Sequence, residues 1–299
     1  MTESMWALWN PAAGSTREGE ALRRRLADTP RLRLIETESA DDLRRRVKEA
    51  AEAQVGHVVA AGGDGTVHGV VEALADTEAP PALGIIPLGT GNDTVRSLAT
   101  PLDPEEALDA LLEGRTRVVP VDLVEVETRE GRFRGINTFM AGNAVRVMEM
   151  TTSEAKAQWG ALAYFQSSLR VLSDLQTFSG QIRIDDEPPL ALEAVNLHLG
   201  NGRCSSGGFP SSPEADPSDG WLDLVVVSPA PLPELALAAA RHLLGDGEED
   251  PRLLCRRVQR VEFDFEPRLD ARLDGEAIPA PLGARVLPGV LPVHVGPSF

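Results

Sequence analysis

Two glycine-rich segments in the first third of the sequence each carry an acidic residue directly after a short apolar run. Gly62-Gly63-Asp64-Gly65-Thr66 follows the run 56–61, and the turn 87–93 follows the run 83–86. Glycine lets a ligand approach the main chain closely, and N–H groups at helix N-termini bind phosphate. Aspartate repels phosphate but binds Mg²⁺ directly or through water. We therefore expect these turns to bind a metal-bound polyphosphate.

One such turn alone is often purely structural, but two that follow neighbouring parallel strands would meet at the edge of the sheet where ligands bind. No G-x-x-x-x-G-K-[ST] segment occurs, so the chain is not a P-loop enzyme. Its two lysines, Lys48 and Lys156, lie away from the glycine turns. The phosphate charge must then be met by backbone N–H groups, helix N-termini and a metal ion.

The elements around these turns alternate between strand and helix over the first 118 residues, which predicts a mostly parallel sheet. Strands are expected at 6–9, 32–36, 56–61 and 83–86, and helices at 17–27, 40–53, 67–75, 94–98 and 104–112. Beyond residue 120 the pattern becomes β-rich, and the expected strands are 121–128, 133–139, 180–185, 191–199, 221–227, 260–265 and 285–295. Two helices are expected at 154–176 and 232–244. We predict an α/β nucleotide-binding domain over 1–119 and a β-sandwich-like domain with helical insertions over 120–299.

The composition excludes several classes of protein. The 299 residues carry a net charge of −17, which argues against a nucleic-acid partner and against broad adhesion to an anionic membrane. The first residues lack a secretory pattern, no run of about 18 apolar residues occurs, and the two cysteines form no metal-binding spacing. We expect a cytoplasmic protein for which transient peripheral contact with a membrane stays open.

The motifs together resemble the diacylglycerol kinase catalytic domain, which bacterial soluble lipid kinases share with sphingosine kinases. The resemblance begins at Asn10-Pro11 and Gly14, and the two glycine turns extend it. It continues in order through 121–123, 160–164, Asn201-Gly202, Gly207-Gly208, 213–223 and 273–276. It implies a three-layer nucleotide domain similar to those of phosphofructokinases and NAD kinases, a β-sandwich, and an active site in the cleft between them. It also implies ATP and Mg²⁺ as cofactors and a lipid as substrate.

The resemblance also assigns residues to ATP. Asp64, Asp93 and Asp122 would form an acidic network around Mg²⁺-ATP, although Asp122 alone would be interpreted as a solvated strand end. The full set that the resemblance implies for the cofactor is Asn10, Pro11, Ala12, Ala13, Gly14, Thr37, Gly63, Asp64, Gly65, Thr66, Val67, His68, Gly69, Thr90, Asp93 and Asp122.

Asp274-Gly275-Glu276 is the expected catalytic pair of acids. Phosphoryl transfer to an alcohol needs a base at the hydroxyl as its proton leaves. Two acids at spacing two point to the same side of an extended segment, and a turn at Gly275 could make them converge. We expect Glu276 to be the general base, supported by Asp274; from spacing alone an acidic turn without catalytic role is the alternative.

A second, structural Mg²⁺ is implied by resemblance at the loop around Asp219. Its other ligands would be main-chain oxygens of Asp216 and Trp221. The same Asp219-Gly220 pair could equally be an ordinary turn.

Some positions depart from the family pattern. His68-Gly69 stands where the family has Asn-Glu, or His-Glu in the sphingosine branch; His68 could bind phosphate or lie on the helix surface. Thr94 replaces a frequent Phe, and a terminal helix of some relatives is not expected after 287–295. The helix around 159–175 could line an acyl-chain pocket or simply pack on the sandwich. The arginines at 23–25 and 44–46 could form a basic patch, but the acids between them favour a solvated face.

These observations favour an ATP- and Mg²⁺-dependent kinase that phosphorylates a lipid hydroxyl. Diacylglycerol is the first candidate, ahead of phosphatidylglycerol, sphingoid bases and a polyprenol. An NAD kinase-like enzyme is an alternative, because that group also uses Gly-Gly-Asp-Gly-Thr. A nucleotide-binding regulator without turnover is another, motivated by Gly69. The sequence leaves the oligomeric state open.

Overall fold

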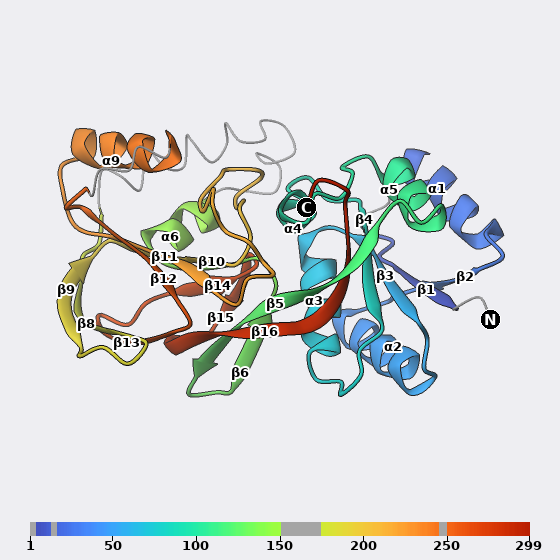
Figure 1. Cartoon of the computed structure of the whole chain (residues 1–299), viewed down its shortest axis with the longest axis horizontal. Coiled ribbons are helices and arrows are strands. Elements are labelled where there is room, and N and C mark those ends of the chain that lie inside the picture. Colours follow the sequence, from blue (N-terminus) through green and yellow to red (C-terminus); the bar gives the residue numbers. More distant parts are fainter. Residues whose placement is uncertain (1–3, 13–16, 151–174, 245–249) are drawn as a thin grey trace. The chain divides into compact units, whose positions relative to one another are not determined.

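The chain folds into two compact units (Figure 1). The computed structural model describes residues 4–12, 17–150, 175–244 and 250–299. The first unit contains Met1–Asp122 together with Gly289–Phe299, and the second contains Leu123–Pro288. The division therefore falls close to the expected boundary between residues 119 and 120, but the last eleven residues return to the first unit instead of completing the second.

The first unit is a parallel sheet covered by helices. Its strand order is β2-β1-β3-β4, and the end of β16 continues it by pairing Val293 with Leu83 of β4 in parallel. The strands are β1 (Met5–Trp9), β2 (Leu32–Glu36), β3 (His57–Gly62), β4 (Ala82–Pro87) and β16 (Pro281–Val295). The helices are α1 (Arg17–Asp28), α2 (Ala40–Glu52), α3 (Asp64–Leu74), α4 (Asp93–Ser97) and α5 (Pro104–Leu112). All four expected strands and five expected helices of this region are present.

Capping and apolar spacing determine these helices. Ser39 caps α2 by accepting the N–H of Asp42 at 3.1 Å, and Asp103 caps α5 by accepting the N–H of Glu106 at 2.9 Å. The apolar stripes of α1 and α5 pack with Trp9 and neighbouring strand residues in one core cluster. Helices α2 and α3 pack against each other.

The second unit is a β-sandwich. One sheet contains β5 (Arg117–Thr128), β6 (Arg132–Gly135), β8 (Phe178–Ile184), β9 (Leu190–Ala194), β13 (Arg260–Glu266) and the first part of β16. The other has the order β12-β11-β10-β7-β14-β15 and is antiparallel throughout. Its strands are β7 (Thr138–Gly142), β10 (Asn196–Gly200), β11 (Leu222–Val227), β12 (Leu253–Val258), β14 (Ala271–Leu273) and β15 (Glu276–Ile278). Phe139 and Phe263 stack between the sheets with ring centroids 5.8 Å apart. The expected α/β-plus-sandwich fold is confirmed.

The prediction of one continuous strand is wrong for two segments of the chain. The run 133–139 divides into β6 and β7, and the run 191–199 divides into β9 and β10. In both cases the chain leaves one sheet and joins the other at the break, so a single regular strand is impossible. The break between β6 and β7 becomes important for the site below.

Helices α6 (Asn143–Met150) and α9 (Leu232–Leu244) belong to the second unit, and α9 has the bounds predicted for it. The helix predicted at 154–176, with its suggested acyl-chain face, lies outside the described residues except for its end; Leu175 and Gln176 are not helical. None of the helices in the described ranges is long and apolar enough to cross a bilayer.

Candidate active site

The two predicted glycine turns touch each other through their main chains. They follow β3 and β4, which are hydrogen-bonded neighbours in the sheet. A Cβ atom added to Gly89 would lie 2.7 Å from Cα of Gly63, and one added to Gly63 would lie 3.2 Å from Cα of Gly89. Only glycine permits this approach at Gly89, because backbone cannot move aside as a side chain can.

Asp64 links the two turns. Its Oδ2 atom accepts the main-chain N–H of Asn92 at 2.8 Å. Asn92 has a left-handed backbone with φ 51°, which asparagine tolerates better than most residues. Its side chain closes the second turn by accepting the N–H of Gly89 at 3.2 Å and donating to the Gly89 carbonyl at 2.8 Å. Asn92 lies in the predicted turn 87–93 but was not among the expected site residues; its left-handed conformation explains the choice of residue.

The loop after β1, which begins at Asn10, contacts the first glycine turn. Asn10 donates from Nδ2 to Oγ1 of Thr66 at 3.0 Å and accepts the N–H of Ala12 at its Oδ1 atom. Thr37 is buried, and both its N–H and its hydroxyl donate to the carbonyl of Trp9, at 2.9 and 3.1 Å. Pro11 and Ala12 are exposed. The predicted residues Ala13 and Gly14 lie outside the described part of the chain.

The three predicted acids differ in their surroundings. Asp64 and Asp93 occupy adjoining turns, because Asp93 directly follows the Asn92 amide that Asp64 holds. Asp122 is 1% exposed, and its Oδ1 atom accepts the N–H of Gly289 at 2.7 Å. The alternative interpretation of Asp122 as a solvated strand end is therefore wrong, since this carboxylate fastens the returning C-terminal segment to β5.

The departure at His68-Gly69 has a packing explanation. Val67 and His68 are both buried in α3, so the suggestion of a surface histidine is wrong. A Cβ atom on Gly69 would lie 2.7 Å from Cδ2 of Leu43 in α2, so a glutamate here would displace that leucine. Gly65 and Thr90, by contrast, are exposed on the two turns.

Asp274 is held by main-chain groups. Its Oδ2 atom accepts the N–H of Ile136 at 2.8 Å, and its Oδ1 atom accepts those of Asn137 and Thr138 at 2.9 Å each. Asp274 and Gly275 have φ of 52° and 90°, as a two-residue hairpin with both central residues left-handed requires. The Asp274 carboxylate therefore fastens the β14–β15 hairpin to the segment before β7.

Glu276 begins β15 and is exposed. It pairs with Leu273 across the hairpin, and β15 is the last strand in the order of its sheet. The two acids of the predicted pair thus differ: the Asp274 carboxylate binds three main-chain amides, whereas Glu276 stands on an exposed edge strand. Of the two acids, Glu276 is exposed and Asp274 is half-buried.

The loop predicted to hold a structural metal contains turn contacts. Asp219 accepts the N–H of Trp221 at 3.0 Å and forms an ion pair with Arg257, and the carbonyl of Asp216 accepts the Asp219 N–H at 3.3 Å. The guanidinium of Arg257 would compete with a cation for Asp219. In the described residues no three His, Cys, Asp or Glu side chains gather as a metal site. The role of Asp216, Asp219 and Trp221 stays a prediction that would rest mainly on main-chain oxygens.

Comparison with known proteins identifies the family. Residues 4–126 match the model of the diacylglycerol kinase catalytic domain, and residues 137–295 match the YegS C-terminal NAD kinase beta sandwich-like domain. The chain belongs to the diacylglycerol kinase family of lipid kinases. Within this family it is 37% identical to the "Probable lipid kinase YegS-like" of Pseudomonas aeruginosa PAO1, over 85% of this chain and 81% of that protein. It is 32% identical to "Diacylglycerol kinase" of Bacillus subtilis strain 168, over 80% and 77%.

Solved structures agree with the family and the fold. A crystal structure named as a candidate diacylglycerol kinase from Bacillus anthracis str. Sterne superposes with a TM-score of 0.82 and 27% identity, covering 99% of this chain and 96% of that chain. An NAD kinase from Archaeoglobus fulgidus in complex with ATP has a TM-score of 0.50 at 12% identity, covering 97% and 92%. The second similarity concerns the fold alone.

Proposed function

We propose that the protein is an ATP- and Mg²⁺-dependent kinase that transfers the γ-phosphoryl group to a lipid hydroxyl, with diacylglycerol as the first candidate. The observation that carries the proposal is the bond from Asn92 to Asp64, which joins two glycine turns at the carboxyl ends of neighbouring parallel strands. The relatives named as lipid kinase and diacylglycerol kinase support the choice of acceptor.

The residues of the first unit are suited to Mg²⁺-ATP. Gly63 and Gly89 bring the two turns into main-chain contact, and the N-terminus of α3, which begins at Asp64 in the first turn, is the kind of helix end that attracts phosphate. The carboxylates of Asp64 and Asp93 are hard oxygen donors of the kind that Mg²⁺ prefers. When bound, the ion would neutralise charge that develops on the phosphates. We include Asn10, Thr37, Thr66 and Asp122 as supports of this region.

Glu276 is the proposed general base. An exposed carboxylate can accept the proton of the lipid hydroxyl as that oxygen attacks phosphorus. Asp274 would fix the hairpin that carries Glu276, instead of sharing the proton. This assignment gives the two acids separate tasks.

The test uses ATP labelled at the γ-phosphate and a total bacterial lipid extract in detergent micelles. We expect label in a lipid fraction only when Mg²⁺ is present, with the product separated by its headgroup. Glu276→Gln should lower the rate of labelling on the order of 100- to 10,000-fold while the thermal unfolding temperature stays unchanged. Glu187→Gln, which changes an exposed acid in the β8–β9 turn, is the matched control. Unchanged labelling by Glu276→Gln would refute the assignment of Glu276 as the general base.

An NAD kinase activity is the second candidate, favoured by the Gly62–Thr66 motif and by the shared fold. Incubation with NAD and ATP decides it. NADP formation without lipid labelling would replace the proposed function.

A further inference from the structure

The segment that links β6 to β7 is bound by side chains from two other parts of the second unit. The N–H groups of Ile136, Asn137 and Thr138 all donate to the Asp274 carboxylate, at 2.8 to 2.9 Å. The carbonyl of Thr138 accepts the N–H of Asp274 at 2.8 Å. One side of this segment is therefore fastened to the hairpin that carries Glu276.

The remaining carbonyls of the segment are bound by Asn201. Its Nδ2 atom donates to the Ile136 carbonyl at 2.6 Å, and its main-chain N–H donates to the Asn137 carbonyl at 2.9 Å, where the N–H of Gly202 also donates at 2.8 Å. Asn137 returns a bond, from Nδ2 to the carbonyl of Cys204 at 2.9 Å. Every main-chain N–H and C=O of residues 136–138 thus has a partner.

Burial makes the loss of any of these hydrogen bonds costly. Asn201 is 0% exposed and Asn137 is 3% exposed, so water does not replace a lost partner. A buried carbonyl without a donor costs far more than the net gain of an ordinary hydrogen bond. Apolar packing alone could not fix this segment, because the chain changes from one sheet to the other here.

We propose that Asn201 is a positioning residue for the reaction: it holds residues 136–138, which hold Asp274, which sets the place of Glu276. The inference rests on the proposed role of Glu276 as the base. Asn201 itself touches neither substrate nor nucleotide in this assignment. A base displaced by about 1 Å loses on the order of 100-fold in rate, which is the size of effect expected.

The experiment uses Asn201→Asp in the full chain. Aspartate keeps the volume but removes the donor to the Ile136 carbonyl and places a negative charge there. We expect the saturating rate of lipid labelling, measured with the lipid extract, to fall roughly 10- to 100-fold while the KM for ATP stays unchanged. Asn143→Asp is the matched control: Asn143 is equally buried and donates from Nδ2 to the carbonyls of Gln176 and Val195, but at the other end of β7. It should lose comparable thermal stability and keep its rate.

A double variant separates positioning from general damage. If Asn201 acts through Glu276, Asn201→Asp should cause no further loss of rate in a Glu276→Gln background, measured at raised enzyme concentration. An equal fold-loss in both backgrounds, an unchanged rate for Asn201→Asp, or an equal loss for Asn143→Asp would overturn the positioning role. If Glu276→Gln alone keeps the full rate, the assignment of the base fails instead.

Discussion

At the scale of single residues, the contact between Gly63 and Gly89 leaves the two glycine turns of the first unit no room for a side chain at Gly89. Gly89→Ala would place a methyl group 2.7 Å from Cα of Gly63, and neither backbone can yield without moving its turn. Overpacking of this kind costs about 1–3 kcal/mol. If that cost falls on the ATP-binding conformation, the KM for ATP should rise on the order of 10- to 100-fold.

Gly84→Ala is the control for Gly89→Ala. Its added Cβ would lie 3.1 to 3.3 Å from side-chain atoms of Leu111 and Val59, which can adjust. Steady-state kinetics with varied ATP should show an unchanged KM for Gly84→Ala. An equally small effect of Gly89→Ala would mean that ATP does not use these turns.

A pH dependence of stability is predicted at His198. Burial, and then the charge of His242, lowers the pKa of His198 from 6.5 to about 4, and its Nε2 atom lies 3.1 Å from Oγ of buried Ser212. The unfolded chain therefore binds the proton first, and stability is lost as the pH falls from 6.5 toward 4. Between pH 7.5 and 5 the loss would be about 2 kcal/mol for a fully enclosed ring, and less here because part of the residue reaches solvent.

Urea unfolding of the wild type and of His198→Gln at pH 7.5 and pH 5 measures this loss. Glutamine can keep a bond to Ser212 but does not titrate, so the variant should lose less stability than the wild type between the two pH values. Equal losses in both proteins would show that His198 is not the group responsible. Burial raises the pKa of the Glu125 carboxyl, but hydrogen bonds from Arg285 and Arg134 outweigh burial and hold this pKa below its usual value. Glu125 therefore stays ionised between pH 7.5 and pH 5 and does not contribute to the measured difference.

Residue types could be predicted from the sequence where chemistry demanded them, but their partners could not. Asp64 and the two turns follow from glycine spacing after apolar runs. The different surroundings of Asp274 and Glu276 do not follow from the sequence, because they depend on the main-chain amides of residues 136–138, which lie far from Asp274 in the chain. Asn201 belongs to a recognised motif, yet only the fold shows which carbonyl its amide reaches.

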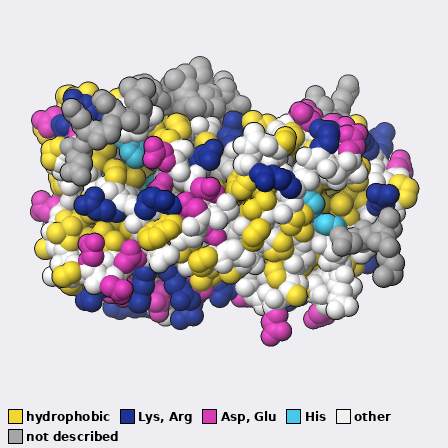
Figure 2. Space-filling view, in the orientation of Figure 1, with side chains coloured by type: hydrophobic (Ala, Val, Ile, Leu, Met, Phe, Trp, Pro, Cys, Tyr) yellow, Lys and Arg dark blue, Asp and Glu magenta, His cyan; other side chains and the backbone are white. Residues whose placement is uncertain are grey.

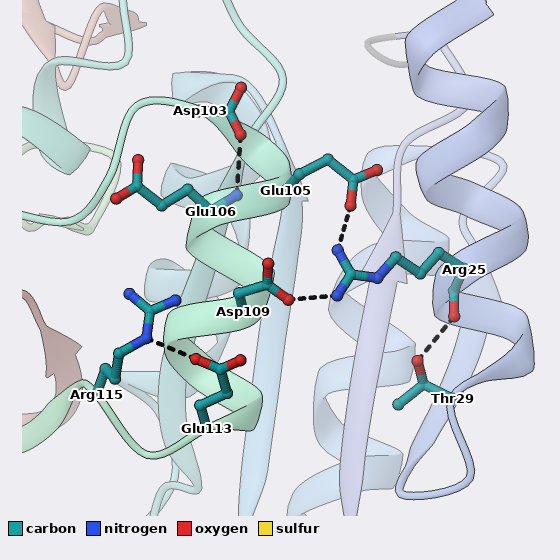
Figure 3. A network of polar contacts seen from close by, with 8 residues as sticks. All are labelled: Arg25, Thr29, Asp103, Glu105, Glu106, Asp109, Glu113 and Arg115. Atoms are coloured by element: carbon teal, nitrogen blue, oxygen red, sulfur yellow. Dashed lines mark hydrogen bonds and ion pairs between the residues drawn. The ribbon is translucent and has the colours of Figure 1, made fainter.

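At the scale of elements, the arginines of α1 and α2 are part of mixed charge networks. Arg25 of α1 bridges Glu105 and Asp109 of α5 (Figure 3), and Arg44 of α2 pairs with Asp41 and with Glu72 of α3. Basic and acidic side chains also lie interspersed on the face shown in Figure 2. The prediction of a solvated, charge-balanced face is therefore supported over that of a basic patch.

The bridge between α1 and α5 should contribute little to stability. Arg25, Glu105 and Asp109 have side chains 40%, 46% and 37% exposed, so solvent screens the two ion pairs. Arg25→Ala should lower the free energy of unfolding by no more than about 1 kcal/mol, and less in high salt. Urea unfolding measures this loss. Comparison with Arg24→Ala, which removes an exposed arginine of the same helix, separates the contribution of the two ion pairs from that of the arginine itself. A loss several times larger would show that the bridge orders α5.

Elements with a clear period were predictable, and those created by a change of sheet were not. The strand and helix pattern of residues 5–112 was confirmed because local periodicity and turns determine each boundary. The runs 133–139 and 191–199 mix apolar and polar residues along their whole length and contain no proline, so the sequence does not mark where one sheet ends and the other begins. The three-residue strands β14 and β15 are too short for any period, and the hairpin Asp274-Gly275 is their signal.

At the scale of the whole molecule, the last part of β16 completes the sheet of the first unit. Leu291, Val293 and Val295 are 0% exposed, and β16 covers the edge of β4. Burying each such side chain contributes roughly 1.5–3 kcal/mol, while a domain's net stability is only about 5–15 kcal/mol. The first 122 residues hold every predicted ATP contact, but they lack a part of their core.

This arrangement predicts that a fragment of residues 1–122 does not fold, whereas the same fragment joined to 289–299 does. A short Gly-Ser linker can join them, because Asp122 accepts the N–H of Gly289 at 2.7 Å. We expect cooperative thermal unfolding and stabilisation by Mg²⁺-ATP only for the joined chain. Joined chains with Val293→Asp should lose both properties, since a charge would replace a fully buried side chain. Cooperative unfolding of 1–122 alone would show that the first unit is complete without its returning strand.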